Sequence, residues 1–140
     1  MNIITNFEKI KQEIKNNLLH RDTKVIAVSK TFSLEHIMPL VQYGHKDFGE
    51  NKVQEAEKKW TALKKTTNTL NLHMIGRLQS NKAKKAVEIF DYIHSLDNEK
   101  LAKELSKRQK EKEKSLGYFI QINLGSEEQK GGLEINDLKN

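Results

Sequence analysis

The stretch VIAVSKTF, residues 25–32, begins with an apolar run and then places a lysine after it. Its first five residues include three β-branched side chains and one alanine, which is typical of a parallel strand buried on both faces. A lysine is almost never buried without a partner, so Lys30 marks the end of this strand. Two interpretations stay open. Either the strand has simply reached solvent there, or the Lys30 amine works at the rim of a pocket.

The composition narrows the class of protein. The chain has 140 residues, a formal net charge of +6 and 36% hydrophobic residues, which favours one domain of ordinary size. It contains no cysteine, which excludes disulfides and thiolate metal sites. The first residues lack a signal-peptide core, and no apolar run approaches membrane-spanning length. We therefore expect a soluble, cytoplasmic protein with no membrane partner.

The positive charge does not indicate nucleic-acid binding. The lysines alternate with glutamates, as in EKLAKELSKRQKEKEK (residues 99–114), and this spacing supports ion pairs on a solvated helix face. No ladder of aromatic side chains accompanies them, so no stacking platform for bases is visible. We expect no nucleic-acid partner, and the alternative of a basic interaction surface on this helix stays open.

The order of the expected elements points to an α/β fold. Helices are predicted at 4–19, 33–43, 51–65, 80–90 and 98–114, strands at 25–29, 46–48, 70–75, 92–94 and 117–124, and the start of another helix at 134–140. After the first helix, strands and helices alternate, which favours a parallel sheet with right-handed crossovers. Two architectures fit: an open doubly wound sheet, or part of a (β/α)8 barrel preceded by an extra helix.

In both architectures, ligands bind at the carboxyl ends of the strands. The polar residues that follow the predicted strands are Lys30, residues 49–51, residues 76–81, His94 with Ser95, and Asn123. No phosphate-binding glycine loop, serine-hydrolase elbow or zinc-binding histidine pair is present in the sequence. An amine at a strand end suits reversible condensation with an aldehyde, because partial burial increases the fraction of the nucleophilic neutral form. Solvation of the lysine is the alternative.

Four segments carry a family resemblance. VIAVSKT (25–31), HKDFGENKVQEA (45–56), LHMIGRLQSNKAKKAV (72–87) and GYFIQINLGSEEQKGG (117–132) resemble the pyridoxal phosphate homeostasis protein family. That family is similar to the N-terminal barrel domain of alanine racemase. The resemblance runs from about residue 24 to the end of the chain, and HMIGRLQSNK is its most specific part.

The resemblance implies a (β/α)8 barrel, of which this chain holds about five of the eight strands. It implies that pyridoxal 5′-phosphate is held as an aldimine on Lys30, in a non-catalytic protein of vitamin B6 and amino-acid homeostasis. It also implies that Asn51 lies near the cofactor. The residues expected to line the same rim are His73, Gly76, Gln79 and Asn81. For Asn51 and Asn81 a helix cap is the alternative interpretation. No catalytic residue and no metal ligand is assigned.

The chain departs from the family in length. Barrels of this type have about 250 residues, and the phosphate is held by loops after the seventh and eighth strands. We therefore expect residues 1–140 to form a single incomplete domain with open edge strands. Full-length relatives are expected to be monomeric, whereas this chain should self-associate or need a C-terminal complement. The alternatives are a racemase, for which Tyr92 or His94 would be the second acid/base, and a non-functional remnant.

Overall fold

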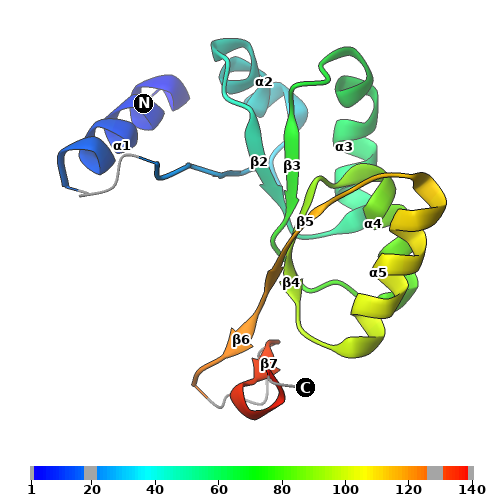
Figure 1. Cartoon of the computed structure of the whole chain (residues 1–140). Coiled ribbons are helices and arrows are strands. Elements are labelled where there is room, and N and C mark those ends of the chain that lie inside the picture. The colour runs from blue at the N-terminus through cyan, green and yellow to red at the C-terminus, as the bar shows by residue number, and fades with distance from the viewer. Residues whose placement is uncertain (1, 18–21, 126–130, 139–140) are drawn as a thin grey trace.

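The computed structural model describes residues 2–17, 22–125 and 131–138. The helices are α1 (Ile3–Asn17), α2 (Leu34–Tyr43), α3 (Val53–Thr66), α4 (Ala83–Ile89) and α5 (Glu99–Lys112) (Figure 1). The strands are β1 (Ala27–Val28), β2 (Asp47–Glu50), β3 (Asn71–Met74), β4 (Tyr92–Leu96), β5 (Gly117–Ile120), β6 (Ile122–Asn123) and β7 (Leu133–Glu134). Single 3-10 turns lie at Ser80–Lys82 and Ile135–Asp137. The alternation of strands and helices confirms the predicted order.

Five strands form one parallel sheet in the order β1-β2-β3-β4-β5. The sheet confirms the α/β class and the succession of crossovers. Figure 1 shows α3, α4 and α5 together on one side of this sheet, and α1 apart from them, beyond α2. β6 and β7 pair with each other in a separate two-stranded sheet. Within the described ranges, no helix is long and apolar enough to cross a membrane.

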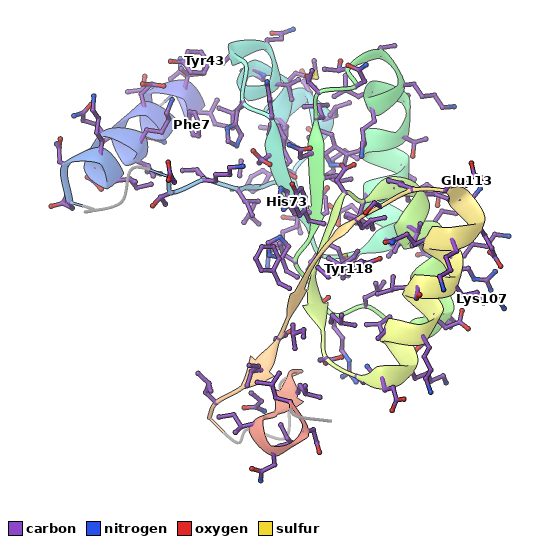
Figure 2. All side chains as sticks on the ribbon, viewed as in Figure 1. Phe7, Tyr43, His73, Lys107, Glu113 and Tyr118 are labelled. Atoms are coloured by element: carbon purple, nitrogen blue, oxygen red, sulfur yellow. The ribbon has the colours of Figure 1, made fainter. Side chains whose placement is uncertain are left out.

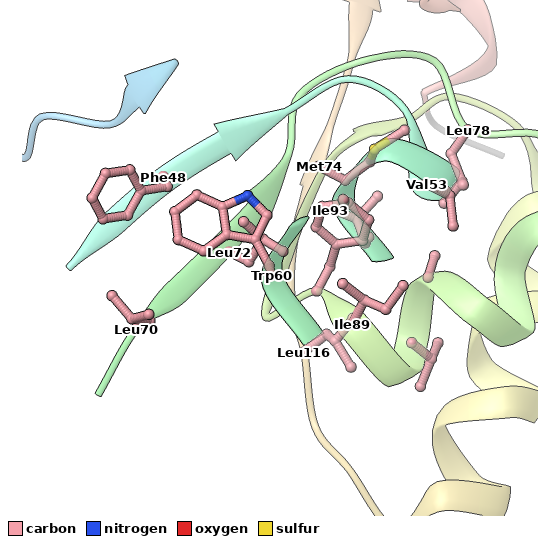
Figure 3. Packing of buried hydrophobic residues seen from close by; sticks show 14 of the residues in the cluster. Phe48, Val53, Trp60, Leu70, Leu72, Met74, Leu78, Ile89, Ile93 and Leu116 are labelled. Carbon is pink, nitrogen blue, oxygen red and sulfur yellow. The ribbon is translucent and has the colours of Figure 1, made fainter. Parts of the chain in front are cut away.

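The hydrophobic core fills the space between the sheet and its helices (Figure 3). Alternate residues of the central strands point into it, among them Phe48, Leu72 and Ile93, each at most 1% exposed. The Phe48 ring lies 4.9 Å from the ring of Trp60, which α3 contributes. Burial of side chains of this size stabilises the fold by about 1.5–3 kcal/mol each. Strand alternation therefore divides the sheet into a helix-covered face and a second face.

Helix α1 contacts the rest of the molecule through the Phe7 ring and through Glu8, which accepts a hydrogen bond from the Tyr43 hydroxyl at 2.7 Å. Phe7 is its only buried residue among those described, and its ring lies 6.3 Å from that of Tyr43 and 4.6 Å from that of His45. Figure 2 labels Phe7 and Tyr43, which face each other from α1 and the end of α2. The predicted helix ran to residue 19, and its last two residues lie outside the described ranges.

Two predictions about strands need correction. The first strand was expected to span 25–29 and to be buried on both faces, but β1 pairs only over Ala27–Val28, and Val28 is 51% exposed. The cause is that Val28 is in register with Gly49 and lies on the sheet face away from the core, where the described residues leave it half exposed. The predicted strand 117–124 is divided, because Gln121 interrupts the ladder between β5 and β6.

Three helix starts also differ from the prediction. The helix expected at 80–90 begins as the 3-10 turn Ser80–Lys82 and becomes regular only in α4. Asn51 does not cap α3, because the N-cap residue is Lys52. The helix expected to start at 134–140 is, over the described residues, strand β7 and the 3-10 turn Ile135–Asp137. The predicted end of α2 is confirmed. Gly44 ends α2 in the left-handed conformation, with φ 106°.

Candidate functional site

Lys30, Asn51 and Gly76 lie at the carboxyl edge of the sheet. Val28 pairs with Gly49, so Lys30 and Asn51 each lie two residues beyond this pair at the ends of neighbouring strands. The Lys30 side chain is exposed. Gly76 follows β3 and approaches the backbone of Asn51 closely: a Cβ atom at position 76 would lie 2.5 Å from the Asn51 carbonyl oxygen. Only glycine permits this approach, which holds the turns after β2 and β3 together.

The Asn51 side chain is unusual in its hydrogen bonding. Its Oδ1 atom is buried and has no hydrogen-bond partner among the described residues. Leaving a buried acceptor unsatisfied costs about 1–3 kcal/mol. Such an atom is therefore suited to accept a hydrogen bond from a bound ligand, at the same edge of the sheet as the Lys30 amine.

Hydrogen bonds fix the backbone on both sides of Lys30. The Ser29 amide and hydroxyl both donate to the Gly49 carbonyl, at 2.9 and 3.2 Å. The Lys59 ammonium donates to the Ser29 carbonyl at 2.7 Å. The Thr31 amide donates to Oε1 of Glu55 at 2.6 Å, with Thr31 at a φ of 66°. The Lys30 backbone is thus fixed, whereas its side chain is free to reach a ligand.

Behind this segment lies a buried ion pair. The Lys59 ammonium is 2.7 Å from Oε1 of Glu50, and the two side chains are 8% and 0% exposed. Trp60 Nε1 donates to the same Glu50 oxygen at 3.1 Å. Lys59 also pairs with Glu55 at 3.2 Å. Glu50 lies in the predicted segment 49–51, but its pairing with Lys59 is not predicted from the sequence, although Glu55 and Lys59 carry the spacing of a helical ion pair.

The sheet face away from the helices holds a row of three hydrogen-bonded side chains. His73 Nε2 lies 2.9 Å from Oδ1 of Asp47, and His73 Nδ1 lies 2.9 Å from Nε2 of His94. A carboxylate only accepts, so in the neutral row His73 donates through Nε2 and accepts from His94 through Nδ1. Tyr92 stacks on His73 at 4.5 Å and Phe119 stacks on His94 at 4.5 Å.

Burial lowers the pKa of His94, and the neighbouring His73 lowers it further. The lowered pKa favours the neutral form of His94, and the hydrogen bond to His73 fixes its tautomer. Figure 2 shows His73 on the side of the sheet away from the helices, and Tyr118 on the side toward α5. His73 pairs in register with Gly49, two residues before Asn51. It thus lies deeper along the sheet than the Lys30 edge.

The remaining predicted site residues lie in the turn after β3. Gln79 is exposed, and its carbonyl accepts from the amide of Lys82 at 3.0 Å. Asn81 is also exposed and lines a shallow depression of about 300 Å³ together with Lys100, Glu104 and Arg108 of α5. The structure thus brings Lys30, Asn51 and Gly76 to one edge and directs Asn81 toward α5. A role for any of them in cofactor binding stays a prediction.

Two larger cavities lie elsewhere in the described part of the chain. One of about 700 Å³ is bounded by α1 and the amino end of β2, and one of about 560 Å³ by β1 and α2. Neither is lined by Lys30 or Asn51. The carboxyl edge is therefore an open surface in this chain, and it is the chemistry of its side chains that identifies it as the candidate site.

Comparison with known proteins gives consistent similarities. The family described as alanine racemase, N-terminal domain, matches residues 2–140. The pyridoxal phosphate homeostasis protein of Pasteurella multocida is 36% identical over 143 residues, covering 99% of this chain and 61% of the relative. PipY of Synechococcus elongatus without PLP superimposes with a TM-score of 0.82 and 37% identity, covering 93% of this chain and 60% of PipY. A second PipY structure, with PLP bound, has a TM-score of 0.80 and 36% identity over 93% of this chain and 59% of PipY.

Proposed function

The chain belongs to the family of alanine racemase N-terminal domains, and from that membership we propose that it binds pyridoxal 5′-phosphate through Lys30. The observation that carries the proposal is the exposed Lys30 amine at a strand end, between two backbone groups that are fixed by hydrogen bonds. The similar relatives with this cofactor in their names or structures support it. The chain spans about three fifths of their length, 61% in the case of the Pasteurella multocida protein.

Reversible capture of an aldehyde requires few protein side chains. The cofactor supplies an aldehyde carbon. The Lys30 amine would hold the cofactor at this carbon through a reversible condensation, which would release one water. The unsatisfied Oδ1 of Asn51 is suited to accept a hydrogen bond from the bound molecule. These residues are suited to the aldehyde end of the cofactor, and Gly76, at the same edge, is proposed as a further contact. His73, which lies deeper along the sheet, and Gln79 and Asn81, in the turn after β3, stay predictions of the sequence.

We propose a non-catalytic role, in which the chain holds the cofactor and contributes to vitamin B6 and amino-acid homeostasis. A racemase needs a second acid/base on the opposite face of the cofactor. The candidates named from the sequence are Tyr92 and His94. Nε2 of His94 is engaged with His73 and its ring is stacked on Phe119, and the Tyr92 ring is stacked on His73. An assay for racemisation of alanine should therefore give no activity above that of the free cofactor.

The test is a visible-absorbance titration with pyridoxal phosphate, followed by borohydride reduction and peptide mapping. The wild-type chain should show saturable binding and a reduced adduct on the peptide that contains Lys30. The Lys30→Ala variant should lose both. Lys46→Ala is the matched control, because Lys46 is equally exposed but precedes β2 at the opposite end of the strand. Non-saturating binding, equal in all three proteins and spread over surface lysines, would refute the proposal.

A further inference from the structure

Helix α3 holds both peptide groups that flank Lys30. The carbonyl of Ser29 belongs to the peptide group before Lys30, and the amide of Thr31 belongs to the one after it. The Lys59 ammonium binds the former at 2.7 Å, and the Glu55 carboxylate binds the latter at 2.6 Å. With both peptide planes fixed, the direction in which the Lys30 Cα–Cβ bond leaves the backbone is fixed as well.

Lys59 is the centre of this arrangement, because it also binds both acidic side chains. Its ammonium lies 2.7 Å from Glu50 and 3.2 Å from Glu55. The Lys59 side chain is 8% exposed, so water screens these interactions little. The hydrogen bond from the Thr31 amide is the main reason that the pKa of Glu55 is lowered, and Lys59 lowers it further.

Edge strands are poorly fixed by their own ladder, and β1 pairs with β2 at only two residues. The segment after β1 therefore depends on contacts outside the sheet. A misplacement of about 1 Å at a reacting group is enough to lower a rate by about a hundredfold. The fixed backbone around Lys30 thus has a consequence for its chemistry as well as for stability.

We propose that Lys59, acting through Ser29 and Glu55, is a positioning residue for the Lys30 amine. The inference rests on the proposed function, in which Lys30 captures the aldehyde. Lys59 does not contact the cofactor. It determines where the Lys30 backbone lies, and hence the fraction of encounters in which the amine meets the aldehyde carbon in a productive direction.

The chain provides a matched control on the same helix. Lys64 also donates from α3 to a backbone carbonyl, that of Ile89 at 2.8 Å, and pairs with Asp91 at 2.5 Å. Its side chain is 19% exposed. Lys64 therefore makes the same kinds of contact as Lys59, a hydrogen bond to a backbone carbonyl and an ion pair. It makes them before β4, at the amino ends of the strands, whereas Lys30 lies at the carboxyl ends. A lysine that acts only on stability would behave like Lys64.

The experiment compares Lys59→Met with Lys64→Met in the full chain by two measurements. Site-resolved amide hydrogen exchange reports on the Thr31 amide without any cofactor. Borohydride trapping with pyridoxal phosphate, followed by peptide mapping, gives the share of adduct on Lys30. In Lys59→Met we expect Thr31 exchange to rise about tenfold, the effect of losing a charge-assisted hydrogen bond, and the Lys30 share to fall severalfold. In Lys64→Met both should stay at the wild-type values. Lys59→Arg keeps a cationic donor and should restore part of both.

Lys59→Met leaves the buried Glu50 charge unpaired, which would explain a failure of this variant to fold. Two further variants test the proposal in that case. Glu50→Gln combined with Lys59→Met removes the buried charge together with its partner. Glu55→Ala removes the Thr31 acceptor and the 3.2 Å pair with Lys59, from a side chain that is 29% exposed, and it keeps the buried pair of Lys59 with Glu50. It should also raise Thr31 exchange and lower the Lys30 share.

The outcomes separate the two proposals. Unchanged Thr31 exchange and an unchanged Lys30 share in the folded variants would overturn the positioning role. Equal losses in Lys59→Met and Lys64→Met would overturn it too, because the effect would then be one of stability. A wild-type chain without saturable capture would overturn the proposed function, and with it the consequence for Lys30. Thr31 exchange would still decide whether Lys59 fixes the backbone.

Discussion

Replacing Gly76 by alanine should disrupt the edge that carries the candidate site. The added Cβ would lie 2.5 Å from the Asn51 carbonyl oxygen, 2.7 Å from its Cβ and 2.8 Å from its Cα. These are backbone atoms and the first side-chain atom, which cannot rotate away, so one of the two turns has to move. Overpacking of this kind costs about 1–3 kcal/mol. A loss of 2 kcal/mol lowers the urea midpoint by about 1 M at an m-value of roughly 2 kcal/mol/M.

The single tryptophan provides the assay. Trp60 is 1% exposed, so its fluorescence should report the unfolding of the core in urea. Gly49→Ala is the matched control, since its Cβ would meet side-chain methyl groups and no backbone atom: Cδ1 of Ile75 at 3.0 Å and Cγ2 of Ile26 at 3.2 Å. It should shift the midpoint by less than half as much. An unchanged midpoint for Gly76→Ala, or a larger loss for Gly49→Ala, would refute the reasoning from backbone contact.

Three further outcomes follow from the structure. Lys114→Met should lower the free energy of unfolding by about 1–3 kcal/mol, because Lys114 donates to the carbonyls of Val87 and Phe90 at 2.9 and 2.8 Å. The control is Lys112→Met at an exposed lysine, which should lower the free energy of unfolding in urea by less than about 0.5 kcal/mol. Burial lowers the pKa of His94 below its ordinary value of 6.5, so the stability that its neutral form contributes is present above pH 6.5 and lost as the pH falls through its folded pKa. The urea midpoint should therefore fall from pH 7 to pH 5, and a His94→Gln variant whose midpoint falls as steeply would contradict this. Phe119, at an edge strand and 54% exposed, should promote self-association, and light scattering should show less association for Phe119→Ser than for wild type.

The order of the elements could be predicted because each carries a local signal. Runs such as residues 25–28 and 117–120 mark strands by their apolar and β-branched side chains, and Gly44 marks the end of α2. The alternation of strands and helices then leaves a parallel sheet as the simplest arrangement. The edge position of the Lys30 strand follows from the strand order, which periodicity does not encode. Periodicity also does not show which elements cover a strand. The prediction that this strand is buried on both faces was therefore wrong at Val28.

The candidate site could be predicted only in part. Lys30 and Asn51 follow strands, so topology alone brings them to one edge. Gly76 joins them because of a close backbone approach, and a single sequence gives no direct sign of it. Glu50 and Lys59 are far less visible, since a charged residue in a strand and a lysine on a helix are ordinarily solvent-exposed. Their pairing depends on the packing of α3 against β2, and only the folded chain shows it.

The contrast between Lys30 and Lys59 supports the proposal that Lys30 captures the aldehyde. Both are lysines near the carboxyl end of β1, but Lys59 is 8% exposed and fully engaged with Glu50, Glu55 and the Ser29 carbonyl. Lys30 is exposed, and its side chain is free of such partners in the part of the chain that the structure describes. A lysine in the position of Lys59 cannot react without breaking a buried ion pair. A lysine in the position of Lys30 has a fixed backbone and a free amine, and this division between the two residues is what reversible capture of an aldehyde requires.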